Sequence, residues 1–225
     1  DKLRLKMAAA AIFFLLCLPA AGALRLRAPS SRMTASTDTA LRLRAPPPRM
    51  TVSTDTAVSL RQSLESLCED TPNNGVDAPP ERQEAISSAI AELEPYCAAA
   101  PARIPLAGVY ELLYCSAKGG SNGKVGPFVG SVTQIFVDDV NFINAVSFFG
   151  GAVKLSLFAE RKILDDAKIQ VDFKSTGLQV FGNELFRKEI KGTGVWRQKF
   201  VSEDGNFRAM LTPSVFVLRK AQDGL

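Results

Sequence analysis

The chain has 225 residues, of which 46% are hydrophobic and 22% are charged, a composition typical of a globular protein with an apolar core. It contains no histidine. Its own residues therefore cannot form a Ser-His-Asp or Cys-His nucleophile, a histidine-ligated zinc site or an imidazole general base. We expect a protein that is not an enzyme and has neither catalytic residues nor a metal site.

The net charge of +4 comes from the N-terminal quarter of the chain. Residues 1–57 hold nine basic and three acidic side chains, which leaves 18 basic and 20 acidic side chains in residues 58–225. A nucleic-acid-binding domain needs a basic face on its folded part. The charge balance therefore argues against nucleic acid as a partner.

Residues 1–23 have the pattern of a signal peptide. Residues 8–23 form an apolar run of 16 residues, shorter than the roughly 20 that a membrane-spanning helix needs. Ala21-Gly-Ala23 supplies a small-x-small cleavage pattern. Residues 1–6, before Met7, are either a translated leader or part of a longer precursor. An anchored N-terminal helix is the alternative interpretation of the run.

A duplicated tract follows. Residues 24–40 recur as 41–57 with 14 of 17 positions identical, and the two copies contain six Arg, two Asp and no Lys or Glu. This composition predicts a transit-peptide-like segment over 24–56. A signal peptide followed by a transit peptide resembles the bipartite presequence of plastid proteins in algae with complex plastids. A basic, flexible membrane-binding arm is the alternative.

Two amphipathic helices are predicted next. In 57–70, apolar residues recur at helical spacing, and 71–80 interrupts the pattern with Pro, Asn and Gly. A second helix begins near Pro80 and ends before Pro95. The apolar stripes of the two helices are Leu60, Leu64, Leu67 and Cys68 in the first, and Ile86, Ala89, Ile90 and Leu93 in the second. Both helices are short, so each must dock on an apolar surface.

From Val109 onward the apolar period changes to two, which predicts seven or eight strands. The expected segments are 109–115, 131–138, 141–149, 152–164, 167–174, 177–181, 194–201 and 215–219. Short turns and no intervening helices favour an antiparallel sheet curled into a barrel or a sandwich. With the helices before it, the folded domain is expected over 57–220.

The polar motifs between the strands are interpreted as structural. Asp138-Asp139 and Asp165-Asp166 fall at predicted turns, where Asp is common. The Gly-rich stretch 119–126 lacks the Ser or Thr of a phosphate-binding loop and is followed by no helix, so a hairpin loop is favoured. The cysteines of the body are expected to be structural thiols, and a Cys68–Cys97 crosslink is left open.

Phenylalanine is abundant, with 14 residues, many of them in predicted strands. A barrel of about eight strands either fills with side chains or holds one small ligand. The candidates for ligand or lipid contact are Phe142, Phe148, Phe149, Phe158, Phe173 and Phe181. The alternative is that all of them are packed core.

Several motifs resemble the plastid lipid-associated protein (PAP)/fibrillin family. The stretch 103–114 (RIPLAGVYELLY) is similar to that family's entry strand, with Tyr110 where Trp is usual. Gly130-Ser-Val-Thr-Gln134 with a following Asn144, and Gly194-Val-Trp-Arg-Gln-Lys-Phe200, are further matches. The closing stretches 206–210 and 216–219 resemble the family's last strands, so the resemblance covers roughly 57–220.

The resemblance implies a mainly β fold, a lipocalin-like antiparallel β-barrel preceded by two short amphipathic helices. It implies structural roles for Gly108, Tyr110, Gly194, Trp196, Arg208 and Arg219. Lipocalin-like barrels commonly close one end with a cation–π contact, here between Tyr110 and Arg208 or Arg219.

The resemblance also implies a function in plastids, at thylakoid or plastoglobule surfaces. The expected partners are apolar small molecules (a prenylquinone, carotenoid or fatty acid), with no obligatory cofactor, and a lipid or thylakoid membrane surface. Two alternatives remain open: an accessory subunit docked on a photosystem or antenna complex, and an enzyme acting on a lipid.

We expect the mature protein to lack residues 1–23 and most of 24–57, because the apolar run ends at a cleavage pattern and an acid-poor, Arg-rich tract follows it. N-terminal sequencing of the native protein tests this. Recovery of Leu24 or any earlier residue would contradict import into a plastid.

Overall fold

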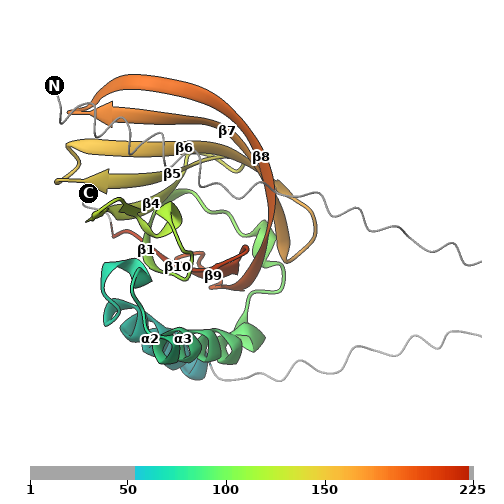
Figure 1. Cartoon of the computed structure of the whole chain (residues 1–225). Helices are drawn as coiled ribbons and strands as arrows, with labels where there is room; N and C mark the ends of the chain where they lie inside the picture. Colours follow the sequence, from blue (N-terminus) through green and yellow to red (C-terminus); the bar gives the residue numbers. More distant parts are fainter. Residues whose placement is uncertain (1–53, 223–225) are drawn as a thin grey trace, which may run out of the picture.

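A computed structural model of the chain describes residues 54–222, which form a closed antiparallel barrel preceded by two helices (Figure 1). The expected mainly β architecture is confirmed, as a barrel and not a sandwich. Around the barrel the strands follow the order β1 (Gly108–Cys115), β10 (Val215–Lys220), β9 (Phe207–Leu211), β8 (Asn183–Val201), β7 (Lys168–Val180), β6 (Val153–Ile163), β5 (Asn141–Phe148) and β4 (Ser131–Phe136). The predicted signal peptide and nearly all of the duplicated tract lie outside the described residues.

The helices α2 (Thr54–Glu69) and α3 (Pro80–Leu93) lie side by side along the outer face of β1, β8, β9 and β10 (Figure 1). Pro80 occupies the first turn of α3, where its missing N–H costs nothing. Helices of 14 to 16 residues are marginal alone in water, so docking stabilises them. The predicted stripes make that contact, and Leu64, Ile86 and Leu93 are fully buried.

The barrel wall separates an inner from an outer apolar core because successive residues of a strand point to opposite faces. The inner core includes Tyr110, Phe142 and Trp196, and a smaller cluster around Phe148 lies on β5, β6 and β7 near the turn 149–152. The helix–barrel core lies outside the wall, where Phe207 and Val217 contact the helices. Strands β9 and β10 are therefore apolar on both faces, and only two helices are needed to cover them.

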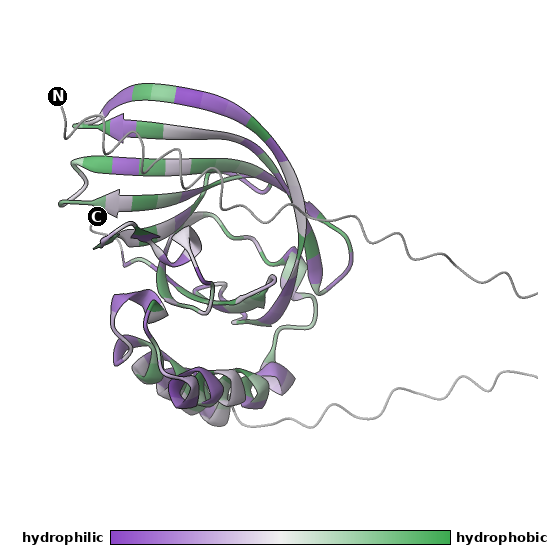
Figure 2. Cartoon of the chain, viewed as in Figure 1, coloured by the Kyte–Doolittle hydropathy of each residue, from purple (hydrophilic) through white to green (hydrophobic). Residues whose placement is uncertain are grey.

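The β7–β8 hairpin differs from the sequence prediction. The segments expected at 167–174 and 177–181 form one strand, β7, with a register shift between Phe173 and Ser175. Strand β8 begins at Asn183, whereas the prediction began at 194. Residues 183–195 are mostly exposed on both faces, so they carry no period-two apolar pattern, and they are held as a strand by hydrogen bonds to β7. Figure 2 shows the hydrophilic residues along this stretch of β8.

The position of Phe200 is a second correction. Strand parity places Phe200 on the same face as Trp196 and Gln198. A register shift between Gln198 and Phe200 instead turns Phe200 to the outer face, opposite Ala209 and within the helix–barrel core. The bulge inserts one residue, Lys199, and one residue is enough to exchange the two faces.

The segment between β1 and β4 contains more structure than the expected hairpin loop. A 3₁₀ turn, Gly120–Asn122, precedes a small hairpin made of β2 (Lys124–Val125) and β3 (Phe128–Val129). The buried Asn122 amide donates to the carbonyl of Ala117, 2.9 Å away, and anchors the loop. No phosphate-loop helix follows the glycines, in agreement with the prediction.

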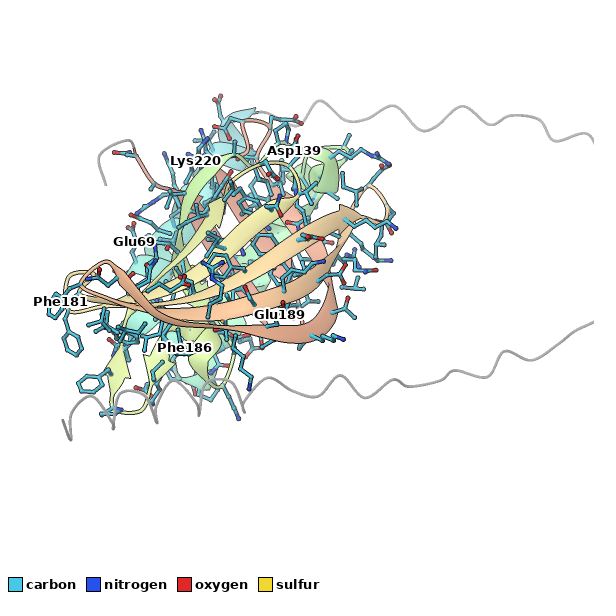
Figure 3. The ribbon with its side chains drawn as sticks, turned by 90° about the horizontal axis from the view of Figure 1, so that it is seen from above. Glu69, Asp139, Phe181, Phe186, Glu189 and Lys220 are labelled. Carbon is cyan, nitrogen blue, oxygen red and sulfur yellow. The ribbon has the colours of Figure 1, made fainter. Side chains whose placement is uncertain are left out.

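The two ends of the barrel are chemically different. The polar end consists of the turns 137–140, 164–167 and 202–206, and the mouth end consists of the connections 116–130, 149–152, 181–182 and 212–214. Figure 3 shows Asp139 and Phe181 at opposite ends of the molecule. Acidic residues gather in the turns of the polar end, beside exposed aliphatic side chains such as Val137 and Leu164. The exposed aromatic side chains Phe128, Phe149 and Phe181 lie at the mouth end.

The acidic residues of the polar end are turn residues, as predicted. Asp138 Oδ1 accepts hydrogen bonds from the backbone N–H groups of Val140 and Asn141, at 2.7 and 2.6 Å. Asp165 Oδ1 accepts from the N–H groups of Ala167 and Lys168. These bonds lower the pKa of both carboxyl groups. Ionised turn carboxylates of this kind hold the chain reversal and do not act as general acids.

Trp196 is buried in the barrel, with its ring edge-on to Phe142 at 5.6 Å between centroids. We predict that Trp196→Ala lowers the free energy of unfolding by about 3–5 kcal/mol, because it removes a large buried ring. Val195→Ala, at the exposed neighbouring position, should change it by no more than about 0.5 kcal/mol. Equilibrium denaturant unfolding measures both. Equal stability of wild type and Trp196→Ala would contradict the barrel register.

Candidate functional site

A cavity of about 650 Å³ occupies the half of the barrel nearer the mouth end. This volume lies within the range of small-molecule sites, about 300–1,000 Å³. Its wall is mainly apolar and includes Leu112, Val132, Val146, Leu155, Leu157, Phe173, Trp196, Met210, Phe216 and Leu218. The lining continues to the loop 117–121 and the turn 212–214, so the cavity reaches the mouth end.

The floor of the cavity is a layer of packed rings. Trp196 lines the cavity and contacts Phe142, which stacks on Phe136 at 5.3 Å. Phe136 in turn meets the edge of Tyr110 at 5.7 Å. Since these rings fill the barrel down to the polar end, a ligand can occupy only the half nearer the mouth.

Arg208 closes the barrel beneath this floor. Its side chain is fully buried, and its guanidinium carbon lies 5.2 Å from the ring centroid of Phe136 and 5.9 Å from that of Tyr110. The Tyr110 hydroxyl donates to the carbonyl of Gly205 at 2.7 Å. Burial lowers the pKa of Arg208 to about 10, so the group is still charged near neutral pH. The sequence analysis named Arg208 and Arg219 as candidates for the cation–π contact with Tyr110, and in the structure Arg208 makes it.

Arg219 lies on the outer face of the barrel instead. Its guanidinium bonds Glu69 of α2 at 2.6 Å and lies 3.7 Å from Glu111 of β1. Arg219 therefore ties the first helix to the barrel wall. Gly108, the first residue of β1, has φ of +114°, a conformation that favours glycine.

Arg161 is a buried residue that the sequence analysis did not single out. It is the last inward residue of β6, its Nε donates to the carbonyl of Asp139 at 2.6 Å, and its guanidinium carbon lies 5.5 Å from the Phe136 ring centroid. Phe136 is thus in contact with two guanidinium groups. The period-two face of β6, continued past Leu157, could have identified Arg161.

A pair of amides, Gln134 and Asn144, interrupts the apolar wall of the cavity. Both line the cavity, on neighbouring strands β4 and β5. Gln134 Nε2 donates to Asn144 Oδ1 at 2.8 Å. Gln134 is 3% exposed, and its Oε1 has no hydrogen-bond partner in the described part of the chain. We call these two residues the amide pair. The sequence analysis identified both as part of a family-motif match but assigned them no role in a cavity.

Three exposed rings border the mouth end. Phe128, Phe149 and Phe181 are 51%, 62% and 79% exposed. Phe128 meets Phe149 edge-on at 5.5 Å, and the N–H of Phe181 donates to the carbonyl of Ala152 in the turn that follows Phe149. We call these three residues the phenylalanine rim.

Two residues of the phenylalanine rim occupy strained backbone positions. Phe149 has φ of +54° and Phe181 has φ of +48°, in the left-handed region that bulky residues rarely adopt. Phe181-Gly182 forms a two-residue hairpin turn, in which Asn-Gly is the preferred sequence. Such strain costs about 1–3 kcal/mol per residue and is typical of functional positions.

The other aromatic candidates lie elsewhere. Phe142 is in the floor, Phe148 is buried beneath the phenylalanine rim, and Phe173 lines the cavity. Phe158 packs under the guanidinium of Arg187, with 4.0 Å between the guanidinium carbon and the ring centroid. Ligand contact by any of these residues stays a prediction.

The remaining chemical groups are inert. Cys68, Cys97 and Cys115 are free, and burial raises the pKa of Cys68 and Cys115 to about 12, which disfavours the reactive thiolate. Within residues 54–222, no His, Cys, Asp and Glu side chains gather in a way that could hold a metal ion. In the same range, neither helix has the length and apolar character needed to cross a membrane.

Comparisons with known proteins agree with this architecture. The chain is 28% identical over 166 residues to the probable plastid-lipid-associated protein 8, chloroplastic, of Arabidopsis thaliana, an alignment that covers 67% of each chain. No solved structure matches the chain at a significant level. The PAP/fibrillin family profile matches residues 58–213, which include most of α2, all of α3 and seven of the eight barrel strands. The chain belongs to the PAP/fibrillin family.

Proposed function

We propose that the protein is a non-enzymatic plastid lipid-associated carrier that holds one apolar small molecule in its barrel and docks on thylakoid or plastoglobule surfaces. The observation that carries this proposal is the apolar cavity of about 650 Å³, whose lining reaches the mouth end of the barrel at the loop 117–121 and the turn 212–214. Family membership and the chloroplastic relative support the plastid location and the association with lipid.

The cavity supports carriage of a prenylquinone, carotenoid or fatty acid portion by its chemistry. Twelve of its lining residues are aliphatic, aromatic or Met, and burial of apolar ligand surface against them gains about 25 cal/mol per Å². No nucleophile paired with a base lies among its lining residues, so the site offers binding without an evident reaction.

The phenylalanine rim supports docking on lipid. Exposed aromatic side chains at hairpin tips gain free energy when they enter a lipid interface. The body has 18 basic and 20 acidic side chains in residues 58–225 and gains little from anionic headgroups. Docking at the rim would bring the mouth end of the barrel, which the cavity lining reaches, toward the lipid.

Bound ligand should accompany the native protein. We predict that protein purified from its native membrane releases an apolar small molecule in about one copy per chain, detected by mass spectrometry of the organic extract. Repeated extraction without any such molecule would favour the alternative, an accessory subunit docked on a photosynthetic protein complex.

Vesicle binding should depend on the phenylalanine rim and little on salt. We predict that Phe149→Asn/Phe181→Asn lowers co-sedimentation with phosphatidylcholine vesicles by about tenfold or more, because burial of one Phe is worth about 1.5–3 kcal/mol. Asn tolerates positive φ, so the thermal stability should be equal to or above that of the wild type. Phe148 is left unchanged because it is buried.

The matched control is Val137→Asn, which removes an apolar side chain of 63% exposure at the polar end and should leave binding unchanged. If salt abolishes binding and the double substitution leaves it unchanged, a basic patch is responsible for attachment. That result would contradict docking through the phenylalanine rim.

A further inference from the structure

We propose that the amide pair, Gln134 and Asn144, is a polar subsite that binds the free hydroxyl group of an otherwise apolar ligand. This inference rests on the proposed carrier function and narrows its ligand class. The ligand would be a long-chain or isoprenoid molecule that ends in an alcohol or phenol.

The geometry leaves one acceptor and several amide N–H donors without protein partners beside the cavity. Gln134 and Asn144 are directly opposite in the antiparallel register of β4 and β5, and their side chains share one hydrogen bond of 2.8 Å. That bond uses Gln134 Nε2 and Asn144 Oδ1. Gln134 Oε1 is buried without a partner, and Asn144 Nδ2 donates to no other group within residues 54–222.

A hydroxyl group matches this pair because it donates one hydrogen bond and accepts others. It can donate to Gln134 Oε1 and accept from Asn144 Nδ2. An ether, ester or ketone brings acceptors only and leaves Gln134 Oε1 without a partner, and a hydrocarbon satisfies neither atom. Rotation of both amides by 180° exchanges the free donor and acceptor, and a hydroxyl satisfies that arrangement equally well.

The position of the amide pair sets the orientation of the ligand. The next inward residues toward the mouth are apolar, Val132 on β4 and Val146 on β5, and the next toward the polar end are the floor rings Phe136 and Phe142. A hydroxyl at the amide pair would therefore lie at the bottom of the cavity. The apolar tail would extend along the wall toward the phenylalanine rim.

Arg208 offers a competing head-group site. Its Nε and Nη1 atoms are buried without partners, which would suit a carboxylate. However, Arg208 is not among the residues that line the cavity, and the inner-core rings and Met210 lie above it. A carboxylate would have to displace the floor, whereas a hydroxyl reaches the amide pair directly.

The test compares three ligands with the same chain: hexadecanol, hexadecyl methyl ether and hexadecanoic acid, each titrated into the full-length protein. Trp196 is the single tryptophan and lines the cavity, so its emission reports occupancy. Co-elution of ligand with protein in gel filtration gives a second readout. We expect the alcohol to bind about three- to tenfold more tightly than the ether.

In Gln134→Leu the preference for alcohol over ether should fall to within about twofold, with the ether bound at least as tightly as by the wild type. The substitution removes an unpartnered buried acceptor together with one hydrogen bond to Asn144, so the two effects on thermal stability should largely offset each other. Asn144→Leu should have the same effect on the preference. The control is Ser156→Ala, which removes a different polar group from the same cavity wall and should preserve the preference.

Equal binding of alcohol and ether by the wild type would overturn the inference while leaving the carrier function standing. So would a preference that survives Gln134→Leu, or an acid that binds far more tightly than the alcohol and ignores both amide substitutions, which would assign the head group to Arg208. Absence of binding by all three ligands would overturn the carrier function itself, and the subsite with it.

Discussion

A guanidinium buried without a carboxylate partner is the constraint around which this barrel is arranged. Arg208 sits at the polar end in contact with the rings of Phe136 and Tyr110, and it keeps its charge there despite a lowered pKa. A charge in such a place needs aromatic faces and a dry, tightly packed surrounding. The rings that provide them fill the half of the barrel nearer the polar end. Free volume can therefore exist only near the mouth end. The stability of one end thus fixes the position of the cavity.

The two helices solve a different problem, the outer face of the barrel. Strands β9 and β10 carry apolar residues outward as well as inward, and α2 and α3 cover that surface. Arg219 adds an ion pair from the wall to Glu69 of α2. The covered side is packed against the helices, whereas the β7–β8 hairpin is exposed on both faces along much of β8. Exposed, strained aromatic tips are found on this free side, where contact with a surface does not disturb the packed core.

The cavity and the phenylalanine rim show how function departs from the best-packed solution. A polar pair inside an apolar wall leaves Gln134 Oε1 unsatisfied, and Phe149 and Phe181 adopt backbone angles that Gly or Asn would adopt at lower cost. Each departure lowers the stability of the empty, isolated molecule. In the proposed function, a ligand or a lipid surface would supply the missing contact at each of these places.

The sequence by itself determined the periodic features: the helical stripe through Leu64 and Ile86, the alternation of β7 up to Phe173, and the turn role of Asp138. These depend on local spacing and backbone geometry, which are written in neighbouring residues. Only the tertiary structure decided that Phe200 faces outward, that Arg208 and not Arg219 meets Tyr110, and that residues 183–195 form a strand. Each of these three results depends on contacts between residues that are distant in the sequence. They are the bulge in β8, the packing of Arg208 on Tyr110 inside the barrel, and the pairing of an exposed segment with β7. The local period of the sequence does not contain this information.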